Sequence, residues 1–257
     1  MKISKIILYD EPSFLKLDLK NIQKFIIQTF GVNSEIRENI FNKLNEKEYE
    51  KIANTRVLDL KKPFKKNKSS FKEISIESEN IDMSREKEIP IYDGIEMKKV
   101  IEETKTISEN TEDILHIIFT NKLTGTFDYD DYRYHARAWV GSNPIIISTT
   151  GIIEAPAKPK QYYMDLVTNF SNELEETIRE KYKGEFLEYD DDRLPEIIEG
   201  YLLQSIMYYE TGDAFCNDAQ CRLFNAHWQK DLFISQIKNQ SLCNQHSKIL
   251  NEMKNNR

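Results

Sequence analysis

The stretch 216-CNDAQCRLFNAHWQKDLFISQIKNQSLCNQH-246 holds all three cysteines of the chain and two of its four histidines. Cys216 and Cys221 form one close pair, and Cys243 and His246 form a second pair with the spacing C-x-x-H. From Asn225 onward the intervening residues have a helical pattern that is long enough to bring the second pair back onto the first. Three thiolates and one imidazole are a usual ligand set for structural zinc. The spacing therefore predicts that these four residues hold one structural zinc ion.

A plainer interpretation is that the three thiols are free and buried, with the histidine at the surface. A reduced cysteine packs as a small hydrophobic side chain, so packing in the core alone would account for the three cysteines. The zinc hypothesis is favoured because every cysteine falls in one short window beside a C-x-x-H pair. It explains what holds the C-terminal part together and leaves the function open.

Composition excludes several classes of protein. The chain has 257 residues, of which 39% are hydrophobic and 31% charged, as in a soluble globular protein with ample residues for a core. Its net charge of −7 argues against nucleic-acid binding, which needs a basic surface. No apolar stretch approaches the length of a membrane span, and Ile6–Tyr9 is too short for a signal peptide. A thiolate zinc site suits a reducing compartment, so we expect a cytoplasmic protein without membrane or nucleic-acid partners.

Changes in composition along the chain predict three parts. Residues 1–60 begin with the strand KISKIILYD and continue with the helical and extended patterns of a small α/β unit. Residues 61–90 are dominated by charge, serine and asparagine, so we expect a charged linker or loop. Residues 91–257 form the third part. Its near-continuous apolar run ILHIIFT, residues 114–120, predicts a strand buried on both faces in the centre of a sheet.

The stretch YRYHARAWV, residues 132–140, alternates in polarity and predicts a single strand with Arg133, His135 and Arg137 on one face. Guanidinium groups bind carboxylates and phosphates through paired hydrogen bonds, so this face could bind an anion. The preceding loop supplies three carboxylates, Asp128, Asp130 and Asp131. A structural network between these acids and the arginines is the favoured interpretation, because partners of opposite charge are plentiful nearby.

Two helices are predicted next. The first has one apolar stripe and ends at Gly184. The stripe consists of Tyr163, Leu166, Val167, Phe170, Leu174, Ile178 and Tyr182. The second helix starts after the acidic residues 190–192, has Pro195 in its first turn and ends at Gly212. Because almost no side of it is polar, we expect a central, buried helix directly before Cys216.

A central helix followed by a glycine turn and a Cys-x4-Cys pair resembles the C-terminal half of the archaemetzincins, a family of zinc metallopeptidases with the motif HExxHxxGxxHC-x4-C. Gly212, Cys216 and Cys221 match this motif, and the resemblance covers about the last three-fifths of the chain. It implies an α/β fold with a metzincin-like mixed sheet packed by helices and a C-terminal zinc-bound segment. The whole chain also resembles an archaeal group of proteins described as metallopeptidases, which shares the stretch FCxxxxCRLFNAHWQ.

The catalytic positions of the motif differ in this chain. Its three histidine positions hold Ser205, Tyr209 and Phe215, its glutamate position holds Ile206, and His246 stands where the family has a cysteine. A hydroxyl, a phenol and a phenyl ring cannot replace imidazoles as zinc ligands at neutral pH. No His-Glu dipeptide occurs in the sequence. We therefore expect the side chains at the three histidine positions to line or fill the former active-site cleft.

The leading hypothesis is a non-catalytic relative that keeps the structural zinc and binds an extended peptide or partner protein in that cleft. It has no catalytic residues. The alternative is an active zinc-dependent hydrolase with a relocated site around His135, built with Arg133, Arg137 and the three nearby acids. A zinc-stabilised nucleic-acid binder is a third hypothesis, and the acidic charge disfavours it.

Overall fold

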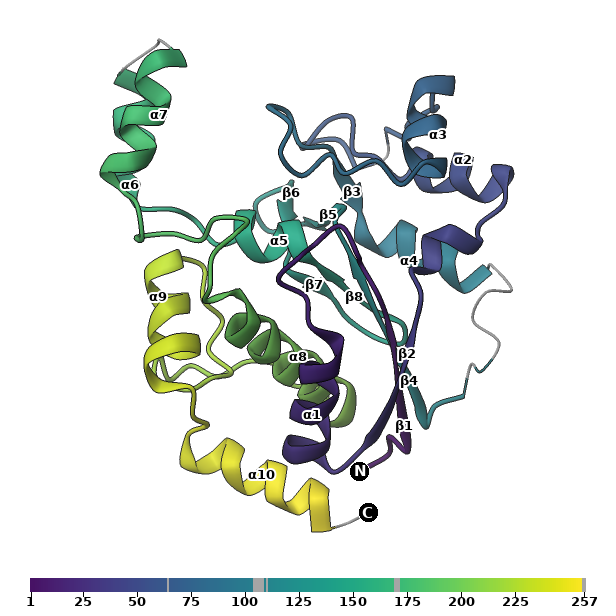
Figure 1. Ribbon diagram of the computed structural model, residues 1–257, viewed down its shortest axis with the longest axis vertical. Helices are drawn as coiled ribbons and strands as arrows, with labels where there is room; N and C mark the ends of the chain where they lie inside the picture. Colours follow the sequence, from purple (N-terminus) through teal and green to yellow (C-terminus); the bar gives the residue numbers. More distant parts are fainter. Residues whose placement is uncertain (64, 104–108, 110, 169–171, 256–257) are drawn as a thin grey trace.

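The computed structural model describes residues 1–63, 65–103, 109, 111–168 and 172–255 of the chain. Its centre is a five-stranded sheet with the order β2-β1-β4-β8-β7, shown in Figure 1. The neighbours from β2 to β8 are parallel, and β7 runs antiparallel to β8 at the edge. The strands are β1 (Lys5–Tyr9), β2 (Asn33–Arg37), β4 (Ile114–Thr120), β7 (Trp139–Val140) and β8 (Ile145–Ser148). The predicted α/β class is confirmed, and β4 is the central strand, as predicted.

A smaller sheet has the order β3-β5-β6. Its strands are β3 (Ile91–Asp93), β5 (Leu123–Asp128) and β6 (Arg133–Ala136). Strands β3 and β5 are parallel, and β6 returns antiparallel to β5. Since β5 follows β4 after two residues, the chain passes directly from the centre of the large sheet into the small one.

Helices cover both faces of the large sheet because side chains alternate along its strands. Ile6 and Leu8 of β1 belong to a core shared with α1 (Leu19–Phe30) and α8 (Leu194–Thr211). Ile7 and Tyr9 belong to a second core on the opposite face. That second core includes residues of η1 (Ile40–Lys43), α2 (Glu46–Asn54) and α4 (Gly94–Glu103). Figure 1 shows α1 and α8 on one side of the sheet and α4 on the other.

Helix α8 is the buried central helix that the sequence predicts. Pro195 lies in its first turn, and Gly212 ends it in the left-handed conformation with φ 80°. Gly200 permits a close approach by the π-helical segment η2 (Ile234–Asn239), because a Cβ there would lie 1.7 Å from Oε1 of Gln236. The helical return predicted after Asn225 begins at α9 (Gln229–Phe233), continues into η2 and ends in α10 (Asn244–Asn255).

The segment 61–90, where a linker or loop was expected, contains helix α3 (Phe71–Ser78). Ser70 and Glu73 form a capping box at its start. Glu77 is 1% exposed and lies 2.6 Å from Nη2 of Arg56 and 2.9 Å from Nζ of Lys122. A buried carboxylate between two cations thus attaches this charged segment to the body. The strands β1 and β2 of residues 1–60 lie in one sheet with later strands, and the division at residues 60 and 90 stays a prediction.

The first predicted long helix is two helices, α6 (Lys160–Thr168) and α7 (Asn172–Lys181), which form an arm beside the body in Figure 1. The prediction of one helix was wrong, and its apolar stripe is only partly buried, since Val167 is 67% exposed. The two helices fold back on each other, so only part of the stripe meets a partner. Their small core consists of Tyr162, Ile178, Tyr182 and Phe186. Phe170 lies outside the described residues.

The prediction of a single strand over residues 132–140 was also wrong. Strand β6 ends at Ala136 in the small sheet, and β7 begins at Trp139 in the large one. Between them the Arg137 N–H donates to the carbonyl of Thr124 at 2.8 Å, whereas the carbonyl of Ala138 accepts from Ser148 at 2.9 Å. The chain changes partners here and crosses from one sheet to the other. The alternating pattern continues through this crossing, so it does not reveal the break.

Candidate metal centre and cleft

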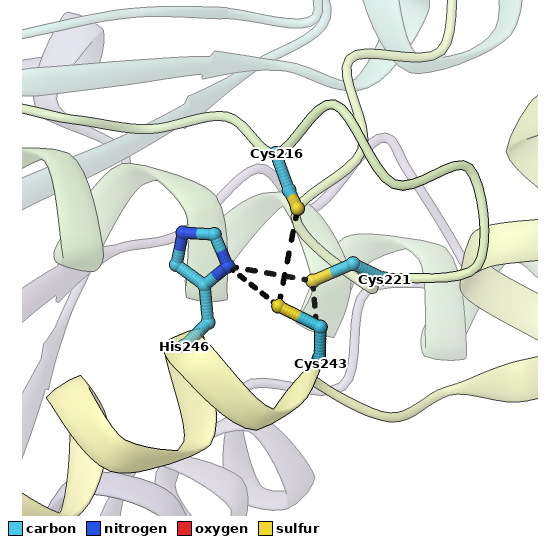
Figure 2. A group of neighbouring side chains, drawn as sticks. All are labelled: Cys216, Cys221, Cys243 and His246. Atoms are coloured by element: carbon cyan, nitrogen blue, oxygen red, sulfur yellow. Dashed lines mark hydrogen bonds between the residues drawn. The ribbon is translucent and has the colours of Figure 1, made fainter.

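The four residues predicted to bind zinc lie together, as Figure 2 shows. Their ligand atoms all lie within 4.8 Å of one another. The sulfur atoms of Cys216 and Cys243 are 4.0 Å apart. Nδ1 of His246 lies 3.8 Å from the sulfur of Cys221 and 3.1 Å from that of Cys243. A tetrahedral ion with bonds of about 2.3 Å places its ligands about 3.8 Å apart, so these donors could hold a metal ion.

Local backbone structure positions both pairs. After Gly212 ends α8, the N–H of Cys216 donates to the carbonyl of Leu223, and the N–H of Cys221 closes a turn onto Asp218. These bonds return the chain so that both sulfurs face the same point. The second pair lies at the start of α10, where a spacing of three residues puts Cys243 and His246 on one side of the first turn. The N–H of Cys243 donates to the sulfur of Cys221 at 3.4 Å.

The thiols of Cys221 and Cys243 have opposite pKa shifts. Burial raises the pKa of Cys221, whose side chain is almost fully enclosed. The backbone N–H of His246 lowers the pKa of Cys243 by donating a hydrogen bond to its sulfur. A divalent cation would favour the thiolate form of both, since a positive charge next to a thiol opposes its protonation. The donor set and its burial therefore fit a zinc ion.

A cleft of about 800 Å³ lies beside this group, between the strands β6 and β7 and the C-terminal half of α8. The strand side consists of residues 135–142, and α8 contributes Tyr201, Gln204 and Tyr208. Residues 212–215 and 224–227 also line the cleft, on either side of the first cysteine pair. Since β7 is an edge strand, the cleft follows an edge of the large sheet.

Helix α8 does not present the expected residues to this cleft. Ser205 is buried and donates to the carbonyl of Leu202 at 3.0 Å. The hydroxyl of Tyr209 donates to the carbonyl of Glu112 at 2.7 Å. Among the three residues at the motif's histidine positions, Phe215 lines the cleft, and the prediction was wrong for the other two. Gln204 and Tyr208, each one residue earlier on the helix, take their place.

Aromatic side chains form one end of the cleft. The ring of Trp139 lies 5.6 Å from that of Tyr208 and 6.1 Å from that of Phe215, measured between centroids. Tyr208 is 37% exposed and Phe215 41% exposed. A Cβ at Gly141 would lie 2.8 Å from Tyr208 and 2.9 Å from Trp139, so only glycine fits beside these two rings. The cleft therefore exposes apolar surface that no described residue covers fully.

The polar face predicted around His135 is divided. His135 and Arg137 line the cleft, whereas Arg133 is exposed outside it. Nε2 of His135 lies 2.7 Å from a carboxylate oxygen of Asp131. Ligand atoms of His135, Asp131 and Asp128 all lie within 4.8 Å of one another, and Asp130 is not part of that group. Nε of Arg137 donates to Thr126 at 2.8 Å.

Gln204, Tyr208 and His227 line the cleft, although the sequence pattern does not predict them as cleft residues. The feature of the sequence that could have indicated the two helix residues is the spacing of Tyr201, Gln204 and Tyr208, which puts all three on one side of a helix. In a helix that is apolar almost all round, that spacing does not distinguish a cleft from a core. His227 is exposed and lines the cleft, and in the sequence it lies between the two pairs of the Cys₃His group.

The fold and the site define a mixed α/β protein with a Cys₃His group that could hold a metal ion and a cleft along the sheet edge. Residues 2–253 match the model of the family described as "Probable metallopeptidase family (DUF6775)", and the chain belongs to this family. This membership confirms the resemblance to metallopeptidases that was noted in the sequence.

The crystal structure of archaemetzincin from Methanopyrus kandleri is similar to this chain, with a TM-score of 0.47 and 10% sequence identity. The similarity covers 98% of this chain and 96% of that one. A comparison with curated proteins finds no match. Among the described residues, no helix combines the length and apolar character that crossing a membrane requires.

Proposed function

We propose that this protein binds an extended peptide, or an extended segment of a partner protein, in the cleft beside β7 without cleaving it. The observation that carries this proposal is a cleft in which an edge strand meets three partly exposed aromatic rings. An edge strand can accept a peptide as an additional strand through main-chain hydrogen bonds. Aromatic side chains are enriched among the residues that dominate binding energy.

The absence of cleavage is inferred from the residues that α8 presents. A zinc peptidase needs imidazole or carboxylate ligands and a carboxylate that activates water. Here the cleft side of α8 carries the amide of Gln204 and the phenol of Tyr208. Ser205 and Tyr209 bind backbone carbonyls instead. None of these groups is a suitable zinc ligand at neutral pH.

We further propose that one zinc ion is held by Cys216, Cys221, Cys243 and His246 in a structural role. Four protein donors fill a tetrahedral shell and leave no position for water or substrate, as in structural zinc sites. The ion would join the turn after α8 to the start of α10. That turn also contributes Phe215 to the cleft, so the metal would support one of its walls.

Binding and cleavage can be tested on the same peptides. Fluorescein-labelled, unstructured peptides would be titrated with zinc-loaded protein by fluorescence anisotropy, and each mixture would then be analysed by mass spectrometry. We expect saturable binding that Tyr208→Ala weakens, together with intact peptides. Tyr132→Ala is the matched control, because Tyr132 is exposed but outside the cleft. Peptide fragments, or no binding at all, would contradict the proposal.

A second candidate function is zinc-dependent hydrolysis at a relocated site, favoured by the close approach of Asp128, Asp131 and His135. Against it, Nη2 of Arg137 lies 3.9 Å from Asp128, and its positive charge would repel a cation. Metal analysis separates the two candidates. One zinc per chain, lost in Cys243→Ser, agrees with the leading proposal. A second zinc that is lost only in His135→Ala would favour the hydrolase.

A further inference from the structure

We infer that the ligand of this cleft presents a carboxylate to the guanidinium of Arg137, so that the cleft selects peptides with an acidic group. The carboxylate can belong to an aspartate or glutamate side chain or to a peptide C-terminus. The inference rests on the proposed peptide binding and adds the chemical class of the ligand. It also assigns Arg137 as the residue that determines this specificity.

The hydrogen bonds of Arg137 leave one edge of its guanidinium available. Nε donates to Oγ1 of Thr126 at 2.8 Å, which fixes the orientation of the group. Nη2 lies 3.9 Å from Oδ2 of Asp128, which is too long for a hydrogen bond. Among the described residues, none accepts a hydrogen bond from Nη1 or Nη2 of Arg137. By contrast, terminal nitrogens of Arg193 and Arg222 donate to backbone carbonyls.

The available edge matches a carboxylate. Two terminal nitrogens of a guanidinium form parallel hydrogen bonds to the two oxygens of a carboxylate, a geometry that a lysine ammonium cannot reproduce. The side chain of Arg137 is 38% exposed and forms part of the cleft lining. Asp128 is 37% exposed, and an ion pair at that exposure and distance contributes little. A ligand carboxylate at hydrogen-bonding distance would therefore replace Asp128 as the partner of Arg137.

The position of Arg137 also defines what else the ligand carries. Arg137 precedes Trp139 by two residues, and both line the cleft. Arg137 lies at the crossing from β6 to β7 and Trp139 begins β7, so both belong to the strand side of the cleft. A peptide running along β7 could therefore place a carboxylate at Arg137 and an apolar side chain against Trp139, Tyr208 and Phe215. The chemistry of the cleft points to an acidic group near an aromatic or aliphatic residue.

The test uses three labelled peptides that share one apolar residue. One has an internal glutamate and an amidated C-terminus, the second has glutamine there and a free C-terminal carboxylate, and the third has glutamine and an amidated C-terminus. Dissociation constants are measured by anisotropy with the full-length, zinc-loaded protein. We expect at least one acidic peptide to bind roughly tenfold or more tightly than the neutral peptide, as for hydrogen bonds to charged groups. The tighter of the two identifies the source of the carboxylate.

Matched variants assign the effect to Arg137. Arg137→Ala should remove the preference, and Arg137→Lys should restore only part of it, because lysine keeps the charge but not the paired donors. Arg133→Ala should leave the preference unchanged, since Arg133 is an exposed neighbour outside the cleft. Asp128→Asn should strengthen binding of the acidic peptide by removing a competing carboxylate. Thermal melts of each variant confirm folding.

The outcomes separate this inference from the proposed function. Equal affinity for acidic and neutral peptides would overturn the inference and leave peptide binding intact. An equal loss in Arg133→Ala and Arg137→Ala would show that the preference arises from general charge attraction, which also overturns it. If none of the peptides binds, the proposed function fails together with the inference.

Discussion

Removing the proposed zinc ion from the Cys₃His group should destabilise the C-terminal part of the protein, and Cys243→Ser should have the same effect. The group joins Cys216 to Cys243, which are 27 residues apart in sequence. In the entropy model of a cross-link, closing a loop of that length stabilises the folded state by about 3.5 kcal/mol. For a chain of this size, that corresponds to a melting temperature lower by roughly 7 to 14 °C.

Calorimetry of the zinc-loaded protein with and without a chelator would measure this shift. Hydrogen exchange would show where protection is lost: we expect it at the end of α8 and in α10, with β1, β4 and β8 unchanged. His227→Ala is the control, because this histidine lies between the two pairs but outside the group. The reasoning would be refuted if chelation left the melt unchanged, or if His227→Ala lowered it as much as Cys243→Ser.

Two further substitutions test the packing. Glu77→Gln should lower the free energy of unfolding by about 3 to 5 kcal/mol at pH 7, because it leaves Lys122 buried without its counter-charge. Glu79→Gln is the control, because Glu79 is an exposed glutamate nearby in the sequence. Burial is the largest single effect on Glu77 and would raise its pKa, but Lys122, Tyr92 and Arg56 together outweigh it, so the pKa is lowered. The stabilisation therefore exists above the ordinary glutamate pKa of about 4.3 and is lost as pH falls through the lower folded value. Chemical denaturation at several pH values should show the difference from wild type shrinking in acid, and a constant difference would contradict this origin. Gly200→Ala should destabilise the protein, because the added Cβ would lie 1.7 Å from Gln236, and this clash should exceed the gain of about 1 kcal/mol that alanine gives over glycine in a helix. Urea unfolding measures the change. A gain of stability would contradict the prediction and would mean that Gln236 moves away freely.

The features that the sequence predicts correctly depend on neighbours close in the chain. The proximity of the Cys₃His group follows from two short spacings and a helical return, and α8 follows from Pro195, Gly212 and its continuous apolar content. Strand β4 is predicted as central because seven consecutive residues carry little polarity. In each case the local sequence pattern and the tertiary packing favour the same structure.

The incorrect predictions concern choices between partners far apart in sequence. One residue turns a helix by about 100°, so a shift of one position separates Tyr209, bound to Glu112, from Tyr208 in the cleft. The pattern around Arg137 alternates equally well in one sheet or across two. The burial of Glu77 depends on Arg56 and Lys122, which no local pattern connects to α3.

The turn after α8 contributes residues to the Cys₃His group and to the cleft at once. Phe215 and Asn225 line the cleft, and the two cysteines between them, Cys216 and Cys221, belong to the Cys₃His group. A backbone hydrogen bond joins Cys216 to Leu223. Variation along this turn is therefore constrained twice, because a substitution that reshapes the cleft also displaces a member of the Cys₃His group. The opposite wall, formed by β6 and β7, contributes no residue to the Cys₃His group and is free of this second constraint. During divergence, a change of ligand preference is expected to arise on the strand side, while the turn keeps its sequence.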